Sequence, residues 1–273
     1  MALVLAGCES AARPTVPPPD AGPLPVDARA SDAAPAEPGP PAATTCPAAA
    51  PARQSANAAQ VVFPIEIQAG GKPMRFGQEV MRKDGVAEKF TLFHAFVAEP
   101  FLLDARGGRI AAQLGDEQGR PLPYGLLLVD PEKATALTLL APAGSYAGLE
   151  LGVGVPAPCN AGDPTKRVFP LSADGDMYWS WGSQYLFVRL EGFVREPGET
   201  TWGRYQLHMG FDQLYRRARL MGPVTVPGTP PTIVFDLDGL IQPDGPGAEP
   251  ATSVVTPDWV AEHISGGAVL SFR

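Results

Sequence analysis

Residues 61–68 read VVFPIEIQ, in which apolar and polar side chains alternate as they do along a half-buried β-strand. Further strand candidates follow, separated by turn signals such as GG, DG, PG and GDP. These candidates lie at 90–104, 124–130, 136–155, 185–194, 203–211, 229–241 and 268–273. Many short strands without a repeat of fixed period predict an all-β fold, an antiparallel β-sandwich formed by a single domain over residues 61–273.

A few segments of this domain favour a short helix or a turn instead of a strand. The candidates for short helices are QLYRRARL at 213–220 and TPDWVAEHI at 256–264, where Pro257 would occupy the first helical position. The sequence PAGSY at 142–146 is typical of a hairpin turn. We interpret VFDLDG at 234–239 as an edge strand that ends in an acidic turn.

Composition excludes several classes of protein. The chain has 273 residues, of which 18% are charged, and it contains 30 glycines and 32 prolines, which argues against a coiled coil or a helical bundle. A formal net charge of −8 argues against a nucleic-acid partner, because the phosphate backbone requires a basic surface. No apolar run approaches the length of about 20 residues that a membrane-spanning helix needs.

The start of the chain predicts a lipid anchor. Residues 1–8 read MALVLAGC, and the last four of them fit the lipobox, in which small residues precede a cysteine that is lipidated. Because a secretory signal needs a basic region and a longer apolar run, we expect that the start of the signal lies upstream of Met1. Glu9 does not suggest retention at the inner membrane. We therefore expect a protein anchored by Cys8 in the periplasm or at the cell surface, at the outer membrane.

The segment that follows predicts a tether. Residues 9–54 hold twelve of the prolines, and alanine, aspartate and threonine make up much of the remainder. Such a composition buries too little apolar surface to offset the entropy of ordering, so the segment is expected to be a disordered spacer. Of the remaining cysteines, Cys46 lies in this spacer and Cys159 in the domain. In an oxidising envelope this pair most simply forms one disulfide.

Standard catalytic motifs are missing from the sequence. It contains no GxSxG, no HExxH and no P-loop, so the protein is not expected to be an enzyme. An acidic site around Asp236 and Asp238 is a weaker hypothesis, because no nucleophile or general base accompanies it.

The remaining candidates for a functional site are two histidines and two tryptophans. His94 and His208 lie on predicted strands, where each could face a common cavity, whereas His263 lies in the helix predicted at 256–264. Trp179 and Trp181 share one face of a strand because side chains repeat every two residues. They form either part of an aromatic core or the wall of a pocket beside the histidines.

The order of several motifs is specific to one family. The chain resembles the MbnP-like copper-binding family, periplasmic or surface proteins that include copper-regulated proteins of methane-oxidising bacteria. The motifs that carry the resemblance are GSYAGLELGVGVP (144–156), Asn160, Asp163-Pro164, Pro170-Leu171, MYWSWGSQYLFVRLEG (177–192) and His208-Met209-Gly210. The tryptophan run with the tyrosine, phenylalanine and Glu-Gly after it is the most diagnostic part.

This resemblance implies a copper site and a partner. In the family, a tryptophan is oxidised to kynurenine by a di-haem enzyme of the MauG/MbnH type and joins histidines as a ligand. Kynurenine supplies an aniline nitrogen, and imidazole suits copper. Carried over to this sequence, the resemblance makes His208 and Trp179 the first candidates for ligands, followed by Trp181 and His94.

One departure from the family pattern leaves an alternative open. Relatives place a histidine directly after the asparagine that precedes Asp-Pro, but here that position is Ala161. If that histidine is a ligand in relatives, copper binding is weaker or absent in this chain. The alternative to a copper protein is therefore a metal-free surface or interaction lipoprotein on the same fold.

Overall fold

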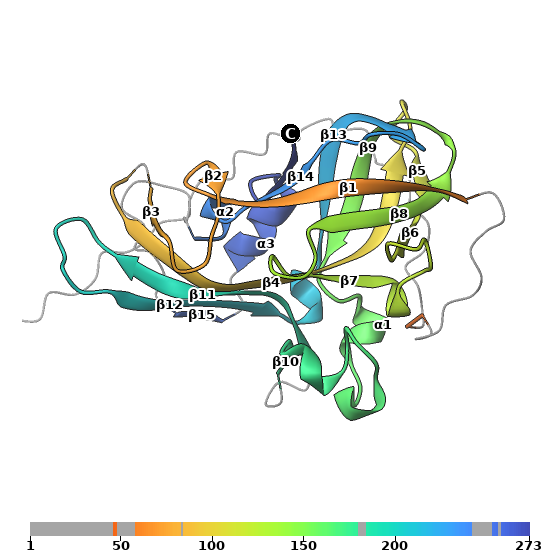
Figure 1. The fold of residues 1–273 in the computed structure, drawn as a ribbon. Helices are drawn as coiled ribbons and strands as arrows, with labels where there is room; N and C mark the ends of the chain where they lie inside the picture. The colour runs from red at the N-terminus through yellow and green to blue at the C-terminus, as the bar shows by residue number, and fades with distance from the viewer. Residues whose placement is uncertain (1–45, 48–57, 83, 180–183, 242–252, 256–257) are drawn as a thin grey trace, which may run out of the picture. The chain divides into compact units, whose positions relative to one another are not determined.

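The computed structural model describes residues 46–47, 58–82, 84–179, 184–241, 253–255 and 258–273, which all belong to one compact unit (Figure 1). The lipobox with Cys8, most of the expected tether and Trp181 lie outside the described residues, so the expectations about them stay predictions. None of the helices in the described ranges is long and apolar enough to cross a membrane.

The expected all-β sandwich is confirmed, because the described strands form two sheets. The smaller sheet has six strands in the order β16-β14-β1-β8-β6, with β2 paired to β1. Its strand β14 runs parallel to β1, and the other pairs are antiparallel. These strands are β1 (Ala58–Ala69), β2 (Lys72–Pro73), β6 (Gln113–Gly115), β8 (Ala136–Pro142), β14 (Ile233–Asp236) and β16 (Leu270–Phe272).

The larger sheet has ten strands and is organised around β4, which pairs with five of them. Its main order is β13-β9-β4-β11-β12-β15. The strands are β3 (Glu79–Met81), β4 (Ala87–Leu103), β5 (Arg109–Ala111), β7 (Leu126–Val129), β9 (Gly144–Val153), β10 (Tyr178–Trp179), β11 (Gln184–Arg195), β12 (Gly203–Gly210), β13 (Arg216–Val226) and β15 (Ser253–Val255).

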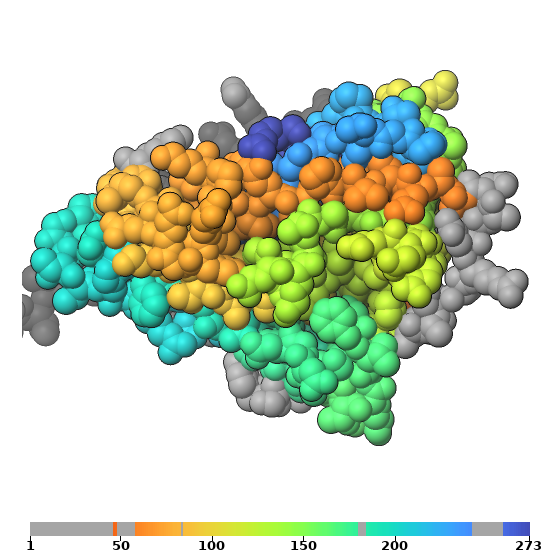
Figure 2. All heavy atoms as spheres, in the orientation of Figure 1, coloured from red at the N-terminus to blue at the C-terminus, as the bar shows by residue number. Residues whose placement is uncertain are grey.

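Short helices connect the strands. They are α1 (Ala157–Asn160), α2 (Asp238–Ile241), α3 (Asp258–Ser265) and the 3-10 turns η1 (Pro123–Gly125), η2 (Pro164–Lys166), η3 (Ala173–Gly175) and η4 (Asp212–Leu214). The segment from α1 to β10, green to teal in Figures 1 and 2, lies below β4, β7 and the end of β11 in these views. Its last element, β10, pairs with β11, the strand between those that carry the candidate histidines.

The hydrophobic core lies between the two sheets and is rich in aromatic side chains. Phe93 of β4 and Phe235 of β14 are fully or almost fully buried, and their ring centroids are 5.8 Å apart. In the smaller sheet, Phe63 of β1 stacks on Phe272 of β16 at 6.0 Å. Burial of this apolar surface is the main force that holds the sheets together.

Two local expectations differ from the structure and one is confirmed. Residues 213–220, expected as a helix, lie mostly in β13, where the buried Ala218 and Leu220 alternate with arginines in the two-residue period of a strand. Residues 142–146 join β8 of one sheet to β9 of the other and do not form a hairpin. The helix expected at 256–264 is present as α3.

The acidic sequence VFDLDG also differs from its interpretation as an edge strand. Its strand, β14, lies between β1 and β16, and α2 follows it. Asp236 accepts a hydrogen bond from the amide of Asp238 at 3.0 Å, and Asp238 accepts one from the amide of Gly70 at 2.9 Å. Both carboxylates therefore bind backbone amides at the junction of β14, α2 and the turn after β1.

Candidate functional site

The two candidate histidines lie in one row across three neighbouring strands. Arg189 of β11 is in register with His94 of β4 on one side and with His208 of β12 on the other. Directly opposed residues project from the same face of a sheet. The chain neighbours of all three are buried in the core, so this histidine row, His94–Arg189–His208, lies on the outer face of the larger sheet.

His208 is held by a carboxylate. Its Nε2 lies 2.9 Å from Oε1 of Glu191, and the same oxygen accepts a hydrogen bond of 2.8 Å from Nε of Arg189. Burial alone would raise the pKa of Glu191, but the hydrogen bonds from His208 and Arg189 outweigh it and lower that pKa. Glu191 is therefore an anion at neutral pH and orients the imidazole of His208.

His94 has a second carboxylate partner. Its Nε2 lies 3.4 Å from Oδ2 of Asp130, which also contacts Nζ of Lys133 at 3.1 Å. Burial, together with the positive charges of Arg189 and Lys133, lowers the pKa of His94, so its imidazole is neutral at neutral pH. The other ring nitrogen, Nδ1, is buried and has no hydrogen-bond partner among the residues that the structure describes. A neutral imidazole with an unpartnered nitrogen is the form that binds a metal ion.

Trp179 lies against the end of the row at His208. Its side chain is largely buried, and its ring is 6.1 Å from the ring of His208 and 5.7 Å from that of Phe211. Gly210 makes room for this approach, since a Cβ there would lie 3.4 Å from the indole and 2.9 Å from the carbonyl oxygen of Tyr185. The structure therefore brings Trp179 and His208 together.

Arg189 is the residue of the row that sequence reasoning missed. Its guanidinium binds Glu191, the carbonyl oxygen of Asp176 at 2.8 Å and the Asp176 carboxylate. Asp176 has a left-handed backbone conformation, with φ at 54°, on the turn before β10. The sequence signal was available, because arginine and glutamate two residues apart in an apolar strand must share its outer face.

Copper fits this row only in part. The row offers two imidazoles and two carboxylates on one side of the sheet, which suits copper in ligand type. However, among the described residues no group of three or more histidine, cysteine, aspartate or glutamate side chains converges closely enough to hold a metal ion. Arg189 stands between the two histidines in strand register, and its guanidinium contacts Glu191 and Asp176.

The structure shows the surroundings of Ala161, the position at which the chain departs from the family pattern. The preceding Asn160 is fully buried, accepts a hydrogen bond from the amide of Tyr185 at 2.9 Å and donates one of 2.7 Å to Asp212. Ala161 itself is exposed, and its carbonyl oxygen accepts a hydrogen bond from Arg167. The asparagine thus holds the loop in place, while the next position offers only a methyl group.

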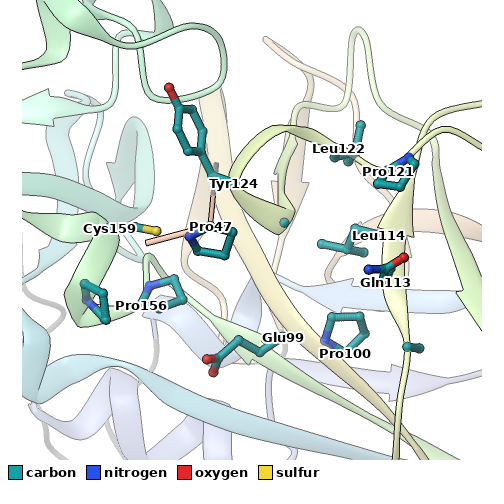
Figure 3. Close-up of a pocket in the computed structure, with 13 residues that line it drawn as sticks. Pro47, Glu99, Pro100, Gln113, Leu114, Pro121, Leu122, Tyr124, Pro156 and Cys159 are labelled. Atoms are coloured by element: carbon teal, nitrogen blue, oxygen red, sulfur yellow. The ribbon is translucent and has the colours of Figure 1, made fainter. Parts of the chain in front are cut away.

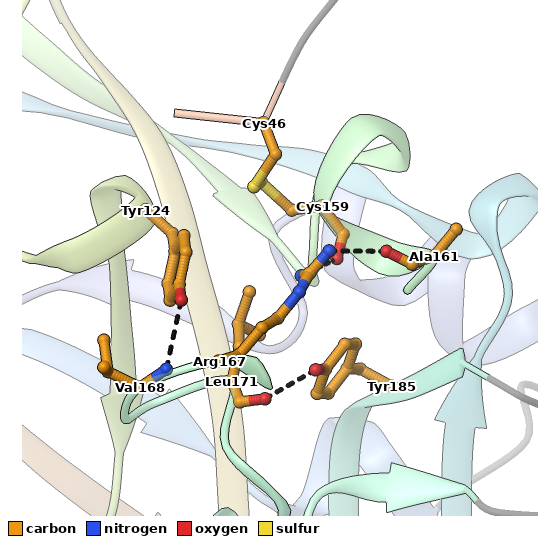
Figure 4. Close-up of a disulfide and its surroundings, with 8 residues drawn as sticks. All are labelled: Cys46, Tyr124, Cys159, Ala161, Arg167, Val168, Leu171 and Tyr185. Atoms are coloured by element: carbon orange, nitrogen blue, oxygen red, sulfur yellow. Dashed lines mark hydrogen bonds between the residues drawn. A yellow bond between two sulfur atoms is a disulfide. The ribbon is translucent and has the colours of Figure 1, made fainter. Parts of the chain in front are cut away.

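A disulfide joins Cys46 to Cys159 of α1 beside this loop (Figure 4). The guanidinium of Arg167 binds the carbonyl oxygens of Cys159 and Ala161, and the hydroxyl of Tyr185 donates to the carbonyl oxygen of Leu171. These contacts tie the segment before β10 to β11. They explain how a long connection that contains only short helical turns holds its shape.

A separate pocket of about 220 Å³ lies next to the disulfide, with Cys159 in its lining (Figure 3). Its walls are mainly apolar and include five prolines, which are Pro47, Pro100, Pro121, Pro156 and Pro158. Tyr124 and Glu99 lie on opposite sides of the view, and both have positive φ angles. The Glu99 carboxylate accepts a hydrogen bond from the Tyr215 hydroxyl at 2.7 Å and pairs with Arg217. No residue of the histidine row lines this pocket.

Comparisons with known proteins agree with this architecture. The family model described as MbnP matches residues 58–246. Among solved structures, the chain is similar to MbnP from Methylosinus trichosporium, with a TM-score of 0.50 and 17% sequence identity over 67% of this chain and 77% of that chain. At this identity the similarity shows the fold alone. No curated protein sequence matches the chain.

Proposed function

The chain belongs to the MbnP family, and from this premise we propose that it is a copper-binding protein of the bacterial envelope and not itself an enzyme. The observation that carries the proposal is the pairing of both histidines with carboxylates. Nε2 of His208 faces Glu191, and Nε2 of His94 faces Asp130. A carboxylate on one ring nitrogen sets the tautomer and leaves the other nitrogen as the ligand, which is the usual support of a metal-binding histidine.

Copper titration of the full chain tests this proposal. We expect His208→Ala to weaken copper binding at least tenfold and His94→Ala to weaken it as well. Loss of a residue that supports a metal ligand commonly lowers metal affinity by about 10–100-fold. His263→Ala is the matched control, because His263 lies on α3 and contacts the carbonyl oxygen of Gly239 at 2.8 Å. Binding that none of these variants changes would contradict the proposal.

Oxidation of a tryptophan belongs to the same proposal. The 6.1 Å between the Trp179 and His208 rings supports Trp179 as the residue that becomes kynurenine, with Trp181 as the second candidate. A di-haem enzyme of the MauG/MbnH type would be the partner. Co-expression with such an enzyme should change the mass by one oxygen gained and one carbon lost. Trp179→Phe should abolish this change, and Trp181→Phe should leave it; the reverse result would exchange their roles.

Lipid anchoring is proposed from the lipobox. With a complete signal upstream, the protein should enter the detergent phase and incorporate labelled palmitate, and Cys8→Ser should abolish both. A protein that stays in the aqueous phase with an intact signal would contradict the anchor.

A metal-free surface or interaction protein is the second candidate. The observation that favours it is the lack of a converging group of metal-binding side chains among the described residues, together with Ala161 in place of the family's histidine. If copper fails to bind both the protein made alone and the protein co-expressed with a di-haem enzyme, this second function is the correct one.

A further inference from the structure

The pocket beside the disulfide has rigid walls and opens to solvent. Its lining includes the buried Pro100, Leu114 and Tyr124 and the exposed Pro47 and Gln113. Because a proline ring fixes its own backbone, the five prolines of the lining give its walls little freedom to collapse. Ligand sites in proteins are commonly preformed, largely apolar cavities of this kind.

Two residues of the lining hold backbone conformations that residues other than glycine rarely adopt. Glu99 has a φ of 43° and lies at an irregularity in the pairing of β4 with β9. Tyr124 has a φ of 59° within η1. Such conformations are costly, and both they and β-bulges cluster at ligand-binding and active sites. The fold thus places two unfavourable conformations around one cavity.

The cavity has room for one ring. Two positions of its lining, Ala112 and Gly125, hold the smallest residues, and a Cβ at Gly125 would have no described atom within 4 Å. An apolar cavity of about 150 Å³ is large enough to bind benzene. A cavity of about 220 Å³ therefore accommodates a single ring with a small substituent.

The free polar group of the lining is a hydrogen-bond acceptor. The Tyr215 hydroxyl and Arg217 both bind Oε2 of Glu99, and Oε1 has no hydrogen-bond partner among the described residues. Arg217 also balances the charge of this carboxylate, so a neutral donor suits Oε1. The prolines contribute no N–H. The hydroxyl of Tyr124 is bound by the amide of Val168, which lies outside the lining.

We propose that this pocket binds a small neutral molecule with one ring and one hydroxyl group, the chemistry of a phenol. The ring lies between the proline walls, and the hydroxyl donates a hydrogen bond to Oε1 of Glu99. The proposal goes beyond copper binding and does not depend on it, because no residue of the histidine row belongs to the lining.

Titration of the full chain with phenol and with toluene tests the site, because the two molecules are similar in size and differ in the hydroxyl. Heteronuclear NMR follows the backbone amide signals of Ala112, Gly125 and Cys159. We expect saturable shifts of these signals with both molecules. Phenol should bind about fivefold more tightly than toluene, the contribution of one hydrogen bond. Benzoate should bind more weakly than phenol, because its carboxylate would meet that of Glu99.

A variant that fills the cavity locates the binding. Ala112→Leu places three more carbon atoms in the space that the ring would take, so it should abolish the shifts with phenol and with toluene. Ala111→Leu is the matched control, because Ala111 is the neighbouring residue, is exposed and does not line the pocket. It should bind both molecules as wild type does.

A second variant tests the hydrogen bond. In Glu99→Gln, Tyr215 and Arg217 still require an acceptor, so the amide oxygen faces them and the amide nitrogen replaces Oε1. Phenol should then bind no more tightly than toluene, whose affinity should not change. Circular dichroism checks the fold of each variant. If Glu99→Gln does not fold, the order of phenol, toluene and benzoate on wild type decides the same question.

Each outcome bears on the site alone. If neither phenol nor toluene gives saturable shifts, or if Ala112→Leu leaves the shifts in place, the pocket is not the binding site. If phenol and toluene bind wild type equally, Glu99 does not accept a hydrogen bond from the ligand and the proposed ligand class is wrong. Copper titration of the same protein is a separate measurement, so failure of one proposal is distinguishable from failure of the other.

Discussion

Two charged clusters on the larger sheet use arginine in different ways. In the Glu150 cluster, the Glu150 carboxylate is fully buried and contacts Arg109 and Arg219 at 2.8 Å each and Arg217 at 3.3 Å. In the histidine row, Glu191 is 14% exposed and contacts Arg189 at 2.8 Å and His208 at 2.9 Å. Three arginines surround the first carboxylate, whereas the second contacts Arg189, the more distant Arg204 at 3.8 Å and an imidazole.

The two clusters therefore differ in the groups that they offer to a further ligand. Three guanidinium groups around one buried carboxylate leave it no acceptor capacity for another ion, so the Glu150 cluster is structural. The histidine row contains two imidazoles, which bind metals when neutral, and an arginine with a second partner at the surface. The three predictions that follow test this contrast, from the largest expected effect to the smallest.

Glu150→Gln is expected to destabilise the fold most. The change leaves three arginines facing one another around a buried amide, and removal of one partner of a buried ion pair commonly lowers the free energy of unfolding by about 3–5 kcal/mol. Because the arginines are partly exposed and can be rehydrated, we expect about 3 kcal/mol in urea denaturation. If Glu150→Gln lowers the free energy of unfolding no more than Glu191→Gln does, the Glu150 cluster is not the more important of the two for stability.

Glu88 is another buried carboxylate, and its contribution to the stability of the fold depends on pH. It is fully buried with Arg82 as its ion-pair partner at 3.1 Å, and burial raises its pKa to about 7. Since the folded-state pKa exceeds the unfolded one, Glu88 favours folding below about pH 4.5, and this contribution is lost as pH rises to about 7.

Comparison of wild type with Glu88→Gln isolates this contribution. Between pH 4.5 and pH 7 the difference in their free energies of unfolding should change by about 3 kcal/mol, with wild type losing stability relative to the variant. Denaturant titrations at several pH values measure it. Parallel pH profiles of the two proteins would show that Glu88 keeps an ordinary pKa in the fold.

Glu191→Gln is expected to have the smallest effect on stability. Because the amide of glutamine can still accept a hydrogen bond from Arg189 or His208, the free energy of unfolding should fall by only about 1–2 kcal/mol. Copper binding should weaken about tenfold or more, because His208 loses the carboxylate that orients it. A large loss of stability together with unchanged copper binding would assign the row a structural role like that of the Glu150 cluster.

Much of the fold was predictable because its signals are local. Alternation in residues such as 61–68 predicted the strands and the sandwich, and the tryptophan run predicted the family, which the match over 58–246 confirms. The helix expected at 213–220 was wrong. The apolar residues of so short a segment fit both the 3.6-residue period of a helix and the two-residue period of a strand. Pairing with β9, a contact distant in the chain, selected the strand.

The sequence by itself determined which residue types are available to the site: His94, His208, the tryptophans and the missing histidine at Ala161. Only the tertiary structure decided that β11 lies between the strands of the two histidines and places Arg189 there. The reason is physical. Periodicity along one strand tells which face a side chain takes, but strand order and register depend on packing between distant segments, and these set which side chains become neighbours.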